Sequence, residues 1–269
     1  MRSDLRCARM RVVVCVKQVP DTGDVRIDPD RGTLIREGIA SVLNPLDSYA
    51  VETAVRLARA HGGSAIALSM GPPQAEAVCR EAIARGCDEA VLLTDRVFAG
   101  ADTWATSHVL ARAIDRLGAV DLVLCGKMAV DGDTAQVGPG IATHLGWPQA
   151  IDCKAITAED GAVHATVLTD QGDEDLRLPT PALCTVLKEA CIPRLSDLVQ
   201  AMHARRTSIP HWDHTAIGAD PARCGLEGSP TRVVEIFTPP ARGECQMLFG
   251  DPADTVPALM RALASREPG

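Results

Sequence analysis

The chain has 269 residues, of which 46% are hydrophobic and 23% charged, so it can bury a sizeable core and is not globally disordered. A net charge of −8, no dense cluster of Lys or Arg, and only 3% aromatic residues argue against nucleic acid as a partner. No apolar run approaches the roughly 18 residues of a membrane span, and the N-terminus lacks the apolar segment of a signal peptide, so we expect a cytoplasmic protein.

Short apolar runs and helical segments alternate along the first part of the chain. Apolar, often β-branched runs of strand length occupy residues 10–16, 65–69, 90–94 and 122–125. Helices are predicted to begin at Asn44, after residue 75, at Asp102 and before residue 141. Asn44 is expected as the N-cap of its helix, with Pro45 in the first helical position. Before this helix, a Pro-Asp-Arg-Gly turn predicts a small hairpin of residues 25–28 and 33–35.

Strands that alternate with helices predict an α/β fold, with a Rossmann-like, doubly wound parallel sheet that helices cover on both faces. Ligands of such sheets bind above the carboxyl ends of the strands. The segments expected at this edge are residues 17–22, 70–74 and 126–138, together with the helix start at 44–47.

The chain changes character after Pro148. The elements predicted next are an antiparallel pair and a last buried strand, at residues 165–169, 175–178 and 181–187. From Cys191 the sequence is rich in Pro, Arg, His and Gly, which predicts an extended arm that closes with a helix over about 254–265. We therefore divide the chain into a nucleotide-binding α/β domain, 10–190, and an arm with a terminal helix, 191–269, that contacts a partner.

Residues 126–139, which read G-K-M-A-V-D-G-D-T-A-Q-V-G-P, carry the main functional signal. They join a predicted buried strand to a helix start, so the unpaired amides of residues 134–138 and the positive end of the helix dipole face the space above the sheet. Phosphate or pyrophosphate is the natural ligand of this geometry. Gly126 and Gly138 allow the backbone to approach such a ligand closely, and Gly132 tolerates positive φ. Thr134 can donate its hydroxyl group.

Two other interpretations of these residues stay open. Asp131 or Asp133 could cap the following helix, which would make the segment a purely structural loop. The same two aspartates could hold a metal ion, although no third acidic ligand lies nearby in the sequence.

Several familiar motifs are absent from the sequence. There is no G-x-G-x-x-G, no G-x-x-x-x-G-K-[ST] and no G-x-S-x-G, which argues against a standard dinucleotide dehydrogenase, a P-loop NTPase and a serine hydrolase. Ten cysteines without a Cys-x-x-Cys pair are expected to be reduced and to act as small hydrophobic residues. His211 and His214 are expected in an exposed loop and not as a metal pair, and Trp104 is expected in the core.

Six segments, in this order along the chain, resemble the beta subunit of electron-transferring flavoproteins, and the resemblance covers nearly the whole chain from Met10. They are V-C-V-K-Q-V-P-D (14–21), N-P-L-D-S-Y-A-V-E (44–52), S-M-G-P-P-Q-A (69–75), F-A-G-A-D-T-W-A-T (98–106), residues 126–139 and P-R-L-S-D-L (193–198). The resemblance implies a heterodimer with an alpha subunit that carries an electron-transferring FAD. It also implies an arm that wraps this partner.

The family has two branches, which differ in what the beta subunit binds. The common branch buries AMP, whereas the bifurcating branch holds the ADP half of a second FAD in the same pocket. D-G-D-T-A-Q-V-G-P, F-A-G-A-D-T-W-A-T and C-G-L-E-G-S-P-T (224–231) resemble the bifurcating and anaerobic members, and small Ala135 and Val137 leave room for a pyrophosphate. Met128 and Lys127 depart from the family pattern, which usually has Gln and, in the bifurcating group, often Arg.

The resemblance also assigns site residues. Those expected to bind the cofactor are Cys15, Lys17, Val19, Pro20, Asn44, Asp47, Met70, Gly71, Asp102, Thr103, Gly126, Met128, Val130, Asp131, Gly132, Asp133, Thr134, Ala135, Gln136, Val137 and Gly138. Leu198 matches the leucine with which the family anchors acyl-CoA dehydrogenases; the alternative is a leucine that packs on the alpha subunit.

The resemblance implies an electron-transfer subunit that is not an enzyme by itself. NADH would deliver hydride to its FAD, one electron would pass through the FAD of the alpha subunit to an acyl-CoA or related dehydrogenase, and the other would pass to ferredoxin or flavodoxin. One alternative is an AMP-bound carrier between acyl-CoA dehydrogenases and a quinone reductase. An alternative of another class is an adenine-nucleotide-sensing module without a redox role.

Overall fold

The computed structural model describes residues 9–21, 26–27, 34–35, 41–234 and 247–265. The chain forms two units, Met1–Val234 and Glu235–Gly269. The division thus falls well after residue 190, and the first part of the predicted arm belongs to the same unit as the sheet.

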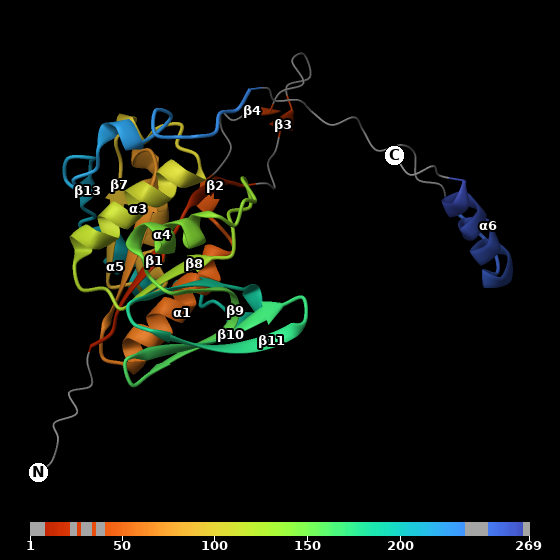
Figure 1. Ribbon diagram of the computed structural model, residues 1–269, viewed down its shortest axis with the longest axis horizontal. Helices are drawn as coiled ribbons and strands as arrows, with labels where there is room; N and C mark the ends of the chain where they lie inside the picture. Colours follow the sequence, from red (N-terminus) through yellow and green to blue (C-terminus); the bar gives the residue numbers. More distant parts are fainter. Residues whose placement is uncertain (1–8, 22–25, 28–33, 36–40, 235–246, 266–269) are drawn as a thin grey trace, which may run out of the picture. The chain divides into compact units, whose positions relative to one another are not determined.

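A nine-stranded sheet crosses the first unit, in the order β11-β10-β9-β12-β8-β1-β6-β7-β13 (Figure 1). Neighbouring strands from β9 to β13 pair in parallel, and β10 and β11 continue one side of the sheet in antiparallel pairing. The strands are β1 Arg11–Cys15, β6 Ser64–Met70, β7 Glu89–Leu93, β8 Leu122–Gly126, β9 Gln149–Glu159, β10 Ala162–Thr169, β11 Gly172–Pro179, β12 Ala182–Val186 and β13 His211–Trp212. Two small antiparallel pairs are β2 Gln18–Pro20 with β5 Ser41–Leu43, and β3 Arg26–Ile27 with β4 Leu34–Ile35.

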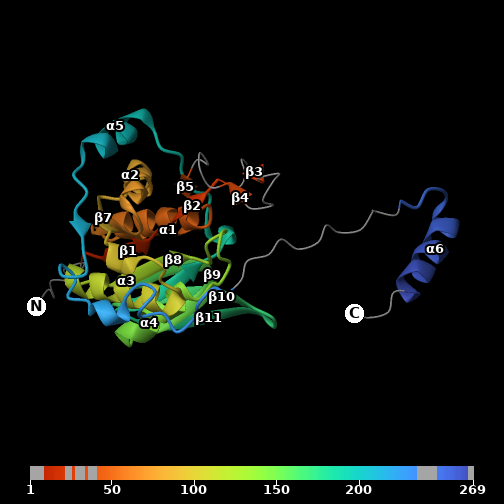
Figure 2. The ribbon, with the colours of Figure 1, turned by 90° about the horizontal axis from the view of Figure 1, so that it is seen from above.

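Helices cover both faces of the sheet (Figure 2). They are α1 Asp47–Ala60, α2 Glu76–Ala84, α3 Thr103–Leu117, α4 Val137–Leu145 and α5 Leu198–Arg206, with short 3-10 turns at Pro73–Ala75, Arg96–Phe98, Lys188–Ala190 and Pro221–Arg223. The second unit holds α6, Pro252–Ala264, near the predicted 254–265. The predicted doubly wound α/β fold is confirmed. None of the helices in the described ranges combines the length and the apolar character that crossing a membrane requires.

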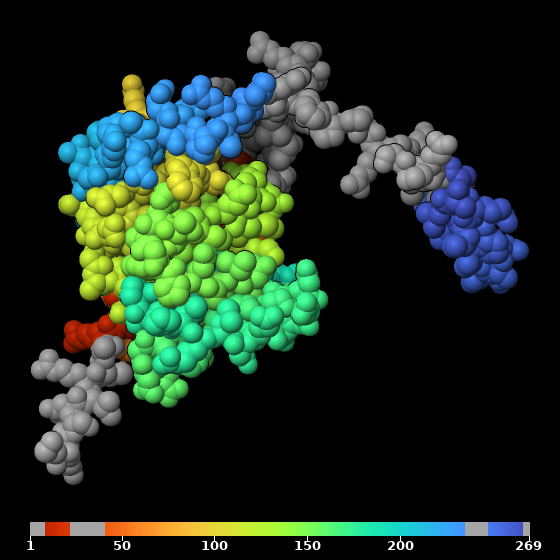
Figure 3. Space-filling model, in the orientation of Figure 1, coloured from red at the N-terminus to blue at the C-terminus, as the bar shows by residue number. Residues whose placement is uncertain are grey.

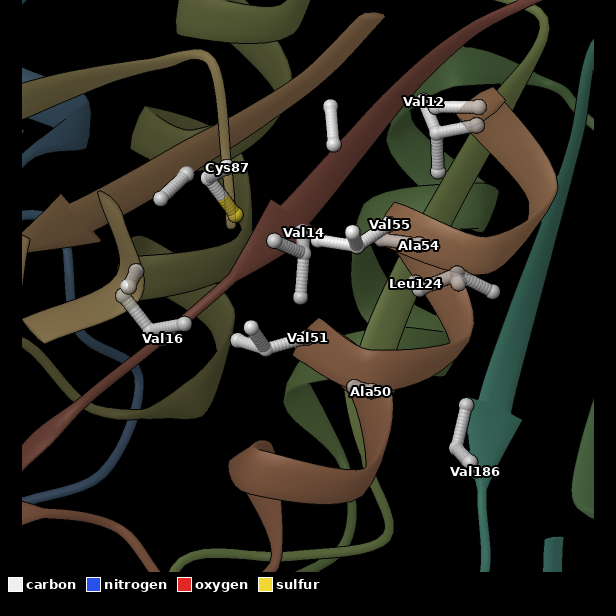
Figure 4. Close-up of a cluster of buried hydrophobic side chains, with 14 of the residues drawn as sticks. Val12, Val14, Val16, Ala50, Val51, Ala54, Val55, Cys87, Leu124 and Val186 are labelled. Atoms are coloured by element: carbon white, nitrogen blue, oxygen red, sulfur yellow. The ribbon is translucent and has the colours of Figure 1, made fainter. Parts of the chain in front are cut away.

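Two buried clusters hold the helices to the sheet, because successive side chains of a strand point to opposite faces. Val12 and Val14 of β1 face α1, where they meet Val51 and Val55 (Figure 4). Val13, between them, faces α3 and α4 in the second cluster. All of these valines are almost fully buried, and full burial of such a side chain contributes roughly 1.5–3 kcal/mol.

Several sequence-based expectations need correction. The structure has four strands that were not predicted, namely β2, β5, β9 and the two-residue β13. The buried strand predicted at residues 181–187 is present as β12, which is an inner strand paired with both β8 and β9. Asn44 is not a helix cap, because α1 begins at Asp47. The Asn44 side chain instead donates a hydrogen bond to Asp47 Oδ1. Trp104 is 47% exposed, so its expected place in the core is wrong. Its position in the first turn of α3 turns the indole outward, against His144 of α4.

The arm as far as Val234 lies on the domain itself. Pro210 O accepts a hydrogen bond from Leu92 N of β7, and Trp212 O accepts one from Thr94 N just after β7, which adds β13 to the edge of the sheet. Further on, the arm crosses the start of α3, where the blue segment covers the yellow one in Figure 3. Ser229 Oγ accepts a 2.8 Å hydrogen bond from Asp102 N there. This segment has no regular hydrophobic pattern of its own. Pairing of β13 with the edge strand β7 therefore explains why it lies on the domain.

Candidate functional site

The ends of three adjacent parallel strands, β8, β1 and β6, form the centre of the site. Parallel pairing sets Cys15 beside Cys125 and beside Leu68, so the loops after all three strands emerge at the same edge of the sheet. These loops contain most of the residues predicted from the sequence. Loops at the carboxyl edge of such a sheet are the usual place for a ligand.

A buried pair, Asn44 and Asp47, joins two of these loops, those after β1 and β8, to the start of α1. Asp47 Oδ2 accepts a 2.8 Å hydrogen bond from Lys17 N, and Asp47 Oδ1 accepts one of 2.8 Å from Asn44 Nδ2. Asn44 Nδ2 also lies 2.9 Å from Met128 O, and Asn44 Oδ1 accepts a 3.2 Å bond from Val130 N. Asn44 is fully buried and Asp47 is 6% exposed, so both residues hold the loops together from beneath.

Asp47 has an altered acidity. Burial raises its pKa to about 7, against the opposing effect of hydrogen bonds from the Asn44 side chain and from the backbone amides of Lys17 and Gly126. A carboxyl group that titrates near neutral pH between the loops after β1 and β8 makes the stability of the site depend on pH.

Gly126 and Gly138 bring backbone close to other parts of the protein, whereas their sequence positions predicted close approach to a ligand. A Cβ on Gly126 would lie 2.4 Å from Asp47 Oδ1 and 2.8 Å from the carbonyl carbon of Leu46. A Cβ on Gly138 would lie 2.8 Å from Thr185 Cγ2. Thr185 Oγ1 in turn accepts a hydrogen bond from Asp152 N at an irregularity of β9. Glycine at 126 therefore lets β8 pass directly beneath the start of α1.

The N-terminus of α4 has free capping positions. Gln136 is the N-cap residue, and no side chain in the described part of the chain caps the helix amides. The interpretation in which Asp131 or Asp133 caps this helix is therefore wrong. Asp133 and Ala135 have φ of 52° and 54°, whereas Gly132, chosen from the sequence because glycine tolerates positive φ, does not have it. Left-handed residues next to helical ones turn successive amides toward a common point, which is a typical anion-binding geometry. We call residues 131–138 the α4 cradle.

Lys17 and Asp131 form an ion pair beside the cradle. Lys17 Nζ lies 2.8 and 2.9 Å from the two carboxylate oxygens of Asp131, and both side chains are partly exposed. Such exposed pairs are worth only about 0–1 kcal/mol, so an incoming anion can take over the ammonium group at little cost. The described residues contain no group of three side chains suited to a metal ion.

Asp102 and Thr103 connect the cradle to the arm. Asp102 Oδ1 caps α3 by accepting a 3.0 Å bond from Ala105 N, and Oδ2 accepts bonds of 3.0 and 2.8 Å from N and Oγ1 of Thr231. Thr103 Oγ1 donates a 3.0 Å bond to Gln136 Oε1 of the cradle. Burial would raise the pKa of Asp102, but its hydrogen bonds with Ala105 and Thr231 lower it.

Asp102→Ala is expected to destabilise the protein by about 0.5–2 kcal/mol, because the first turn of α3 loses its cap and Thr231 loses its acceptor. Urea denaturation followed by circular dichroism measures this change. Asp115→Ala, which removes only an exposed pair with Arg112, is the matched control and should stay within about 0.5 kcal/mol of the parent protein. Equal midpoints for the two variants would contradict the capping role.

The other predicted residues take different places. Val19 is buried in β2, Met70 and Gly71 end β6, and residues 130–136 are exposed around the cradle. Leu198 is exposed in the first turn of α5. The contacts of Thr185, Ser229 and Thr231 were not predicted, and they join residues far apart in the sequence, so no local signal marks them.

The two histidines of the arm have separate partners. His211 Nε2 lies 2.8 Å from Glu76 Oε2, and His214 Nδ1 lies 2.6 Å from Asp95 Oδ2. His211 is part of β13 and not of a free loop, which corrects the predicted placement. The eight cysteines within the described ranges are free thiols.

The fold and the site together define a doubly wound α/β domain in which the N-terminus of α4, without a side-chain cap, lies at the carboxyl edge of the sheet. Residues 31–217 match the model of the electron transfer flavoprotein domain. The chain belongs to the electron transfer flavoprotein family.

Close relatives agree with this assignment. The caffeyl-CoA reductase–Etf complex subunit CarD of Acetobacterium woodii is 46% identical over 92% of this chain and 95% of its own length. The electron transfer flavoprotein subunit beta of Clostridium acetobutylicum is 45% identical over 89% of this chain and 92% of its own. Protein FixA of Azorhizobium caulinodans is 40% identical over 96% of this chain and 95% of its own.

Proposed function

We propose that this chain is the beta subunit of a heterodimeric electron transfer flavoprotein and that it binds FAD on the α4 cradle. The observation that carries the proposal is the N-terminus of α4, where no described side chain caps the amides and Asp133 and Ala135 have left-handed φ. A phosphate group would satisfy these amides and meet the positive end of the helix dipole. The residues present therefore fit the diphosphate of a dinucleotide.

FAD is favoured over AMP because a cation lies beside the cradle. Lys17 Nζ forms an exposed ion pair with Asp131, and a second phosphate can replace that carboxylate. We assign the adenine half to the ends of β1 and β6, at Cys15, Met70 and Gly71, and the ring half to the side of Val19 and Pro20, toward the alpha subunit. Bound FAD would supply the redox chemistry, with NADH as hydride donor and with the FAD of the alpha subunit and ferredoxin or flavodoxin as acceptors.

The chain's own residues would bind and orient the cofactor. Asn44 and Asp47 keep the segments around Lys17, Met128 and Val130 in register, and the buried strand ends exclude water from below. The isolated chain is not proposed to catalyse a reaction.

A dehydrogenase is the proposed partner of the exposed side of the arm. Five apolar side chains are exposed along residues 192–202, and we call them the apolar stripe: Ile192, Leu195, Leu198, Val199 and Met202. Exposed apolar patches of this kind mark interaction sites. One short segment is far smaller than the ~2,000 Å² or more that an obligate subunit interface buries, and it suits the low end, below about 1,200 Å², typical of transient redox contacts. An acyl-CoA or related dehydrogenase fits this role.

The cofactor content of the purified heterodimer tests the proposal. We expect two FAD per heterodimer after acid extraction, quantified by absorbance and chromatography, with no AMP. One FAD and one AMP would overturn FAD binding by this chain and leave a simple electron carrier. A heterodimer without flavin would instead support a nucleotide-sensing module.

A further inference from the structure

The apolar stripe belongs to a segment with few apolar anchors of its own. Its five side chains are between 46% and 86% exposed. Only Ala204 and Ile209 of this region turn inward and join the core beneath α5, beside α2. Figure 2 shows α5 over α2, at the outer surface of the helical layer. One alanine and one isoleucine give limited hydrophobic stabilisation for a segment of this length, so other contacts must keep it in place.

The first of these contacts is a buried carboxylate at the start of the segment. Glu52 of α1 has a side chain that is only 4% exposed. Glu52 Oε2 accepts bonds of 2.6 Å from Arg194 Nε and 3.2 Å from Arg194 N, and Glu52 Oε1 accepts one of 3.0 Å from Arg194 Nη2. Bidentate pairs between arginine and a carboxylate fix geometry as well as distance.

The neighbours of this pair strengthen it. Burial alone would raise the pKa of Glu52, but the hydrogen bonds from Arg194 and Arg56 lower it to about 2, so the carboxylate stays ionised. Arg85 Nη1 donates a 3.2 Å bond to Arg194 O from the other side. The backbone on either side of Arg194 carries Ile192 and Leu195, whose side chains remain exposed.

The second contact lies at the far end of α5. Arg80 Nη1 of α2 lies 2.7 Å from Ala204 O, 3.3 Å from Arg205 O and 3.2 Å from Thr207 O, and so satisfies carbonyl groups at the helix C-terminus. Glu76 holds Arg80 in turn, with 2.5 Å between Oε1 and Nη2. The segment is thus fixed at both ends by charged groups of α1 and α2.

We propose that Glu52 and Arg80 are positioning residues that hold the apolar stripe in one conformation for docking of the redox partner. The inference rests on the function proposed above. A segment fixed in advance loses less conformational entropy on docking, and this favours encounter without any direct contact between Glu52 and the partner. Charged contacts from Glu52 and Arg80 anchor this segment because most of its apolar side chains face outward and cannot do so.

The test uses the intact heterodimer and Glu52→Gln, which keeps the shape of the side chain but removes its charge. Arg56→Met is the matched control, because Arg56 contacts the same carboxylate from within α1 and does not touch the segment. Hydrogen exchange of the amides of residues 192–207 should become about tenfold faster or more in Glu52→Gln and change far less in Arg56→Met, where Arg194 still holds the ionised carboxylate. Arg80→Met provides a second, independent release of the segment if Glu52→Gln folds poorly.

Steady-state electron transfer with butyryl-CoA dehydrogenase and butyryl-CoA as probe gives the functional result. We expect the KM for the dehydrogenase to rise about 5- to 20-fold in Glu52→Gln, with kcat and flavin content unchanged. Leu198→Ala should raise KM in the parent protein and have a smaller additional effect in the Glu52→Gln background, because the two residues act on the same docking step.

The possible results separate the inference from the function on which it rests. Unchanged exchange in both Glu52→Gln and Arg80→Met, or faster exchange with an unchanged KM, would overturn the positioning role. If Leu198→Ala instead abolished heterodimer assembly on size exclusion, the stripe would belong to the alpha-subunit interface and the inference would be wrong. No saturable transfer by the parent heterodimer would contradict the dehydrogenase partner itself.

Discussion

Gly126→Ala is expected to weaken nucleotide binding by the heterodimer and to lower its stability. The added Cβ would lie 2.4 Å from Asp47 Oδ1, 2.8 Å from Leu46 C and 2.9 Å from Asp47 N, and two of these three atoms are backbone. Neither strand β8 nor the start of α1 can yield without breaking the hydrogen bonds around Asp47. Overpacking of this kind costs about 1–3 kcal/mol or more.

The same substitution displaces the loop after β8 and the segment before α1, which both border the cradle. A loss of nucleotide affinity of about 10- to 100-fold corresponds to roughly 1.4–2.7 kcal/mol, which is comparable to the cost of the clash. Urea denaturation measures the stability change, and nucleotide extraction from the purified heterodimer measures the occupancy.

Gly132→Ala is the matched control for Gly126→Ala. Gly132 lies in the same loop, has no atom within 4 Å of an added Cβ, and does not have positive φ. The control should therefore keep its denaturation midpoint, which separates the clash at Gly126 from a general effect of alanine in this loop. Full occupancy in Gly126→Ala would show that close approach of β8 to α1 is not required by the site.

Asp47→Asn is expected to change how stability depends on pH. The pKa of Asp47 is about 7 in the folded protein, well above the ordinary aspartate value of about 3.9 in the unfolded chain. The folded protein therefore binds more protons between these two values, and stability falls as pH rises through this window and levels off above about pH 7. Asn cannot ionise, so the variant lacks this contribution.

Two effects of Asp47→Asn are separable. The substituted side chain has only one oxygen, so its NH₂ group must face one of the two buried donors, Lys17 N or Asn44 Nδ2. The hydrogen bond lost there costs about 1–3 kcal/mol at every pH. The difference in unfolding free energy between the parent and Asp47→Asn should therefore be largest at pH 5. It should shrink by on the order of 2–3 kcal/mol by pH 8.

Urea denaturation at several pH values between 5 and 8.5 measures both effects. Asp115→Asn, at an exposed position of α3, controls for the general influence of removing a negative charge. A constant difference between the parent and Asp47→Asn across this range would mean that Asp47 is ionised throughout.

The fold follows from the sequence because its signals are local and repeated. The valines of β1 and the helical spacing of α3 are explained by neighbours within a few residues, and strands that alternate with helices have few allowed topologies. The site follows in part, since parallel strands bring the loops after Cys15, Met70 and Gly126 to one edge. The role of Asn44 does not follow: its good N-cap chemistry predicts a cap, but tertiary contacts with Met128 and Val130 take its side chain instead.

The sequence by itself determined the alternating fold, the place of the phosphate-type loop at residues 126–139 and the family. Each of these depends on residue types at short, regular spacing. The tertiary structure decided which residues touch one another across the chain: Asp47 beneath Gly126, Lys17 beside Asp131, and Arg194 on Glu52. Such contacts arise only when separate segments pack together, and burial then sets their charge and geometry, which no local pattern encodes.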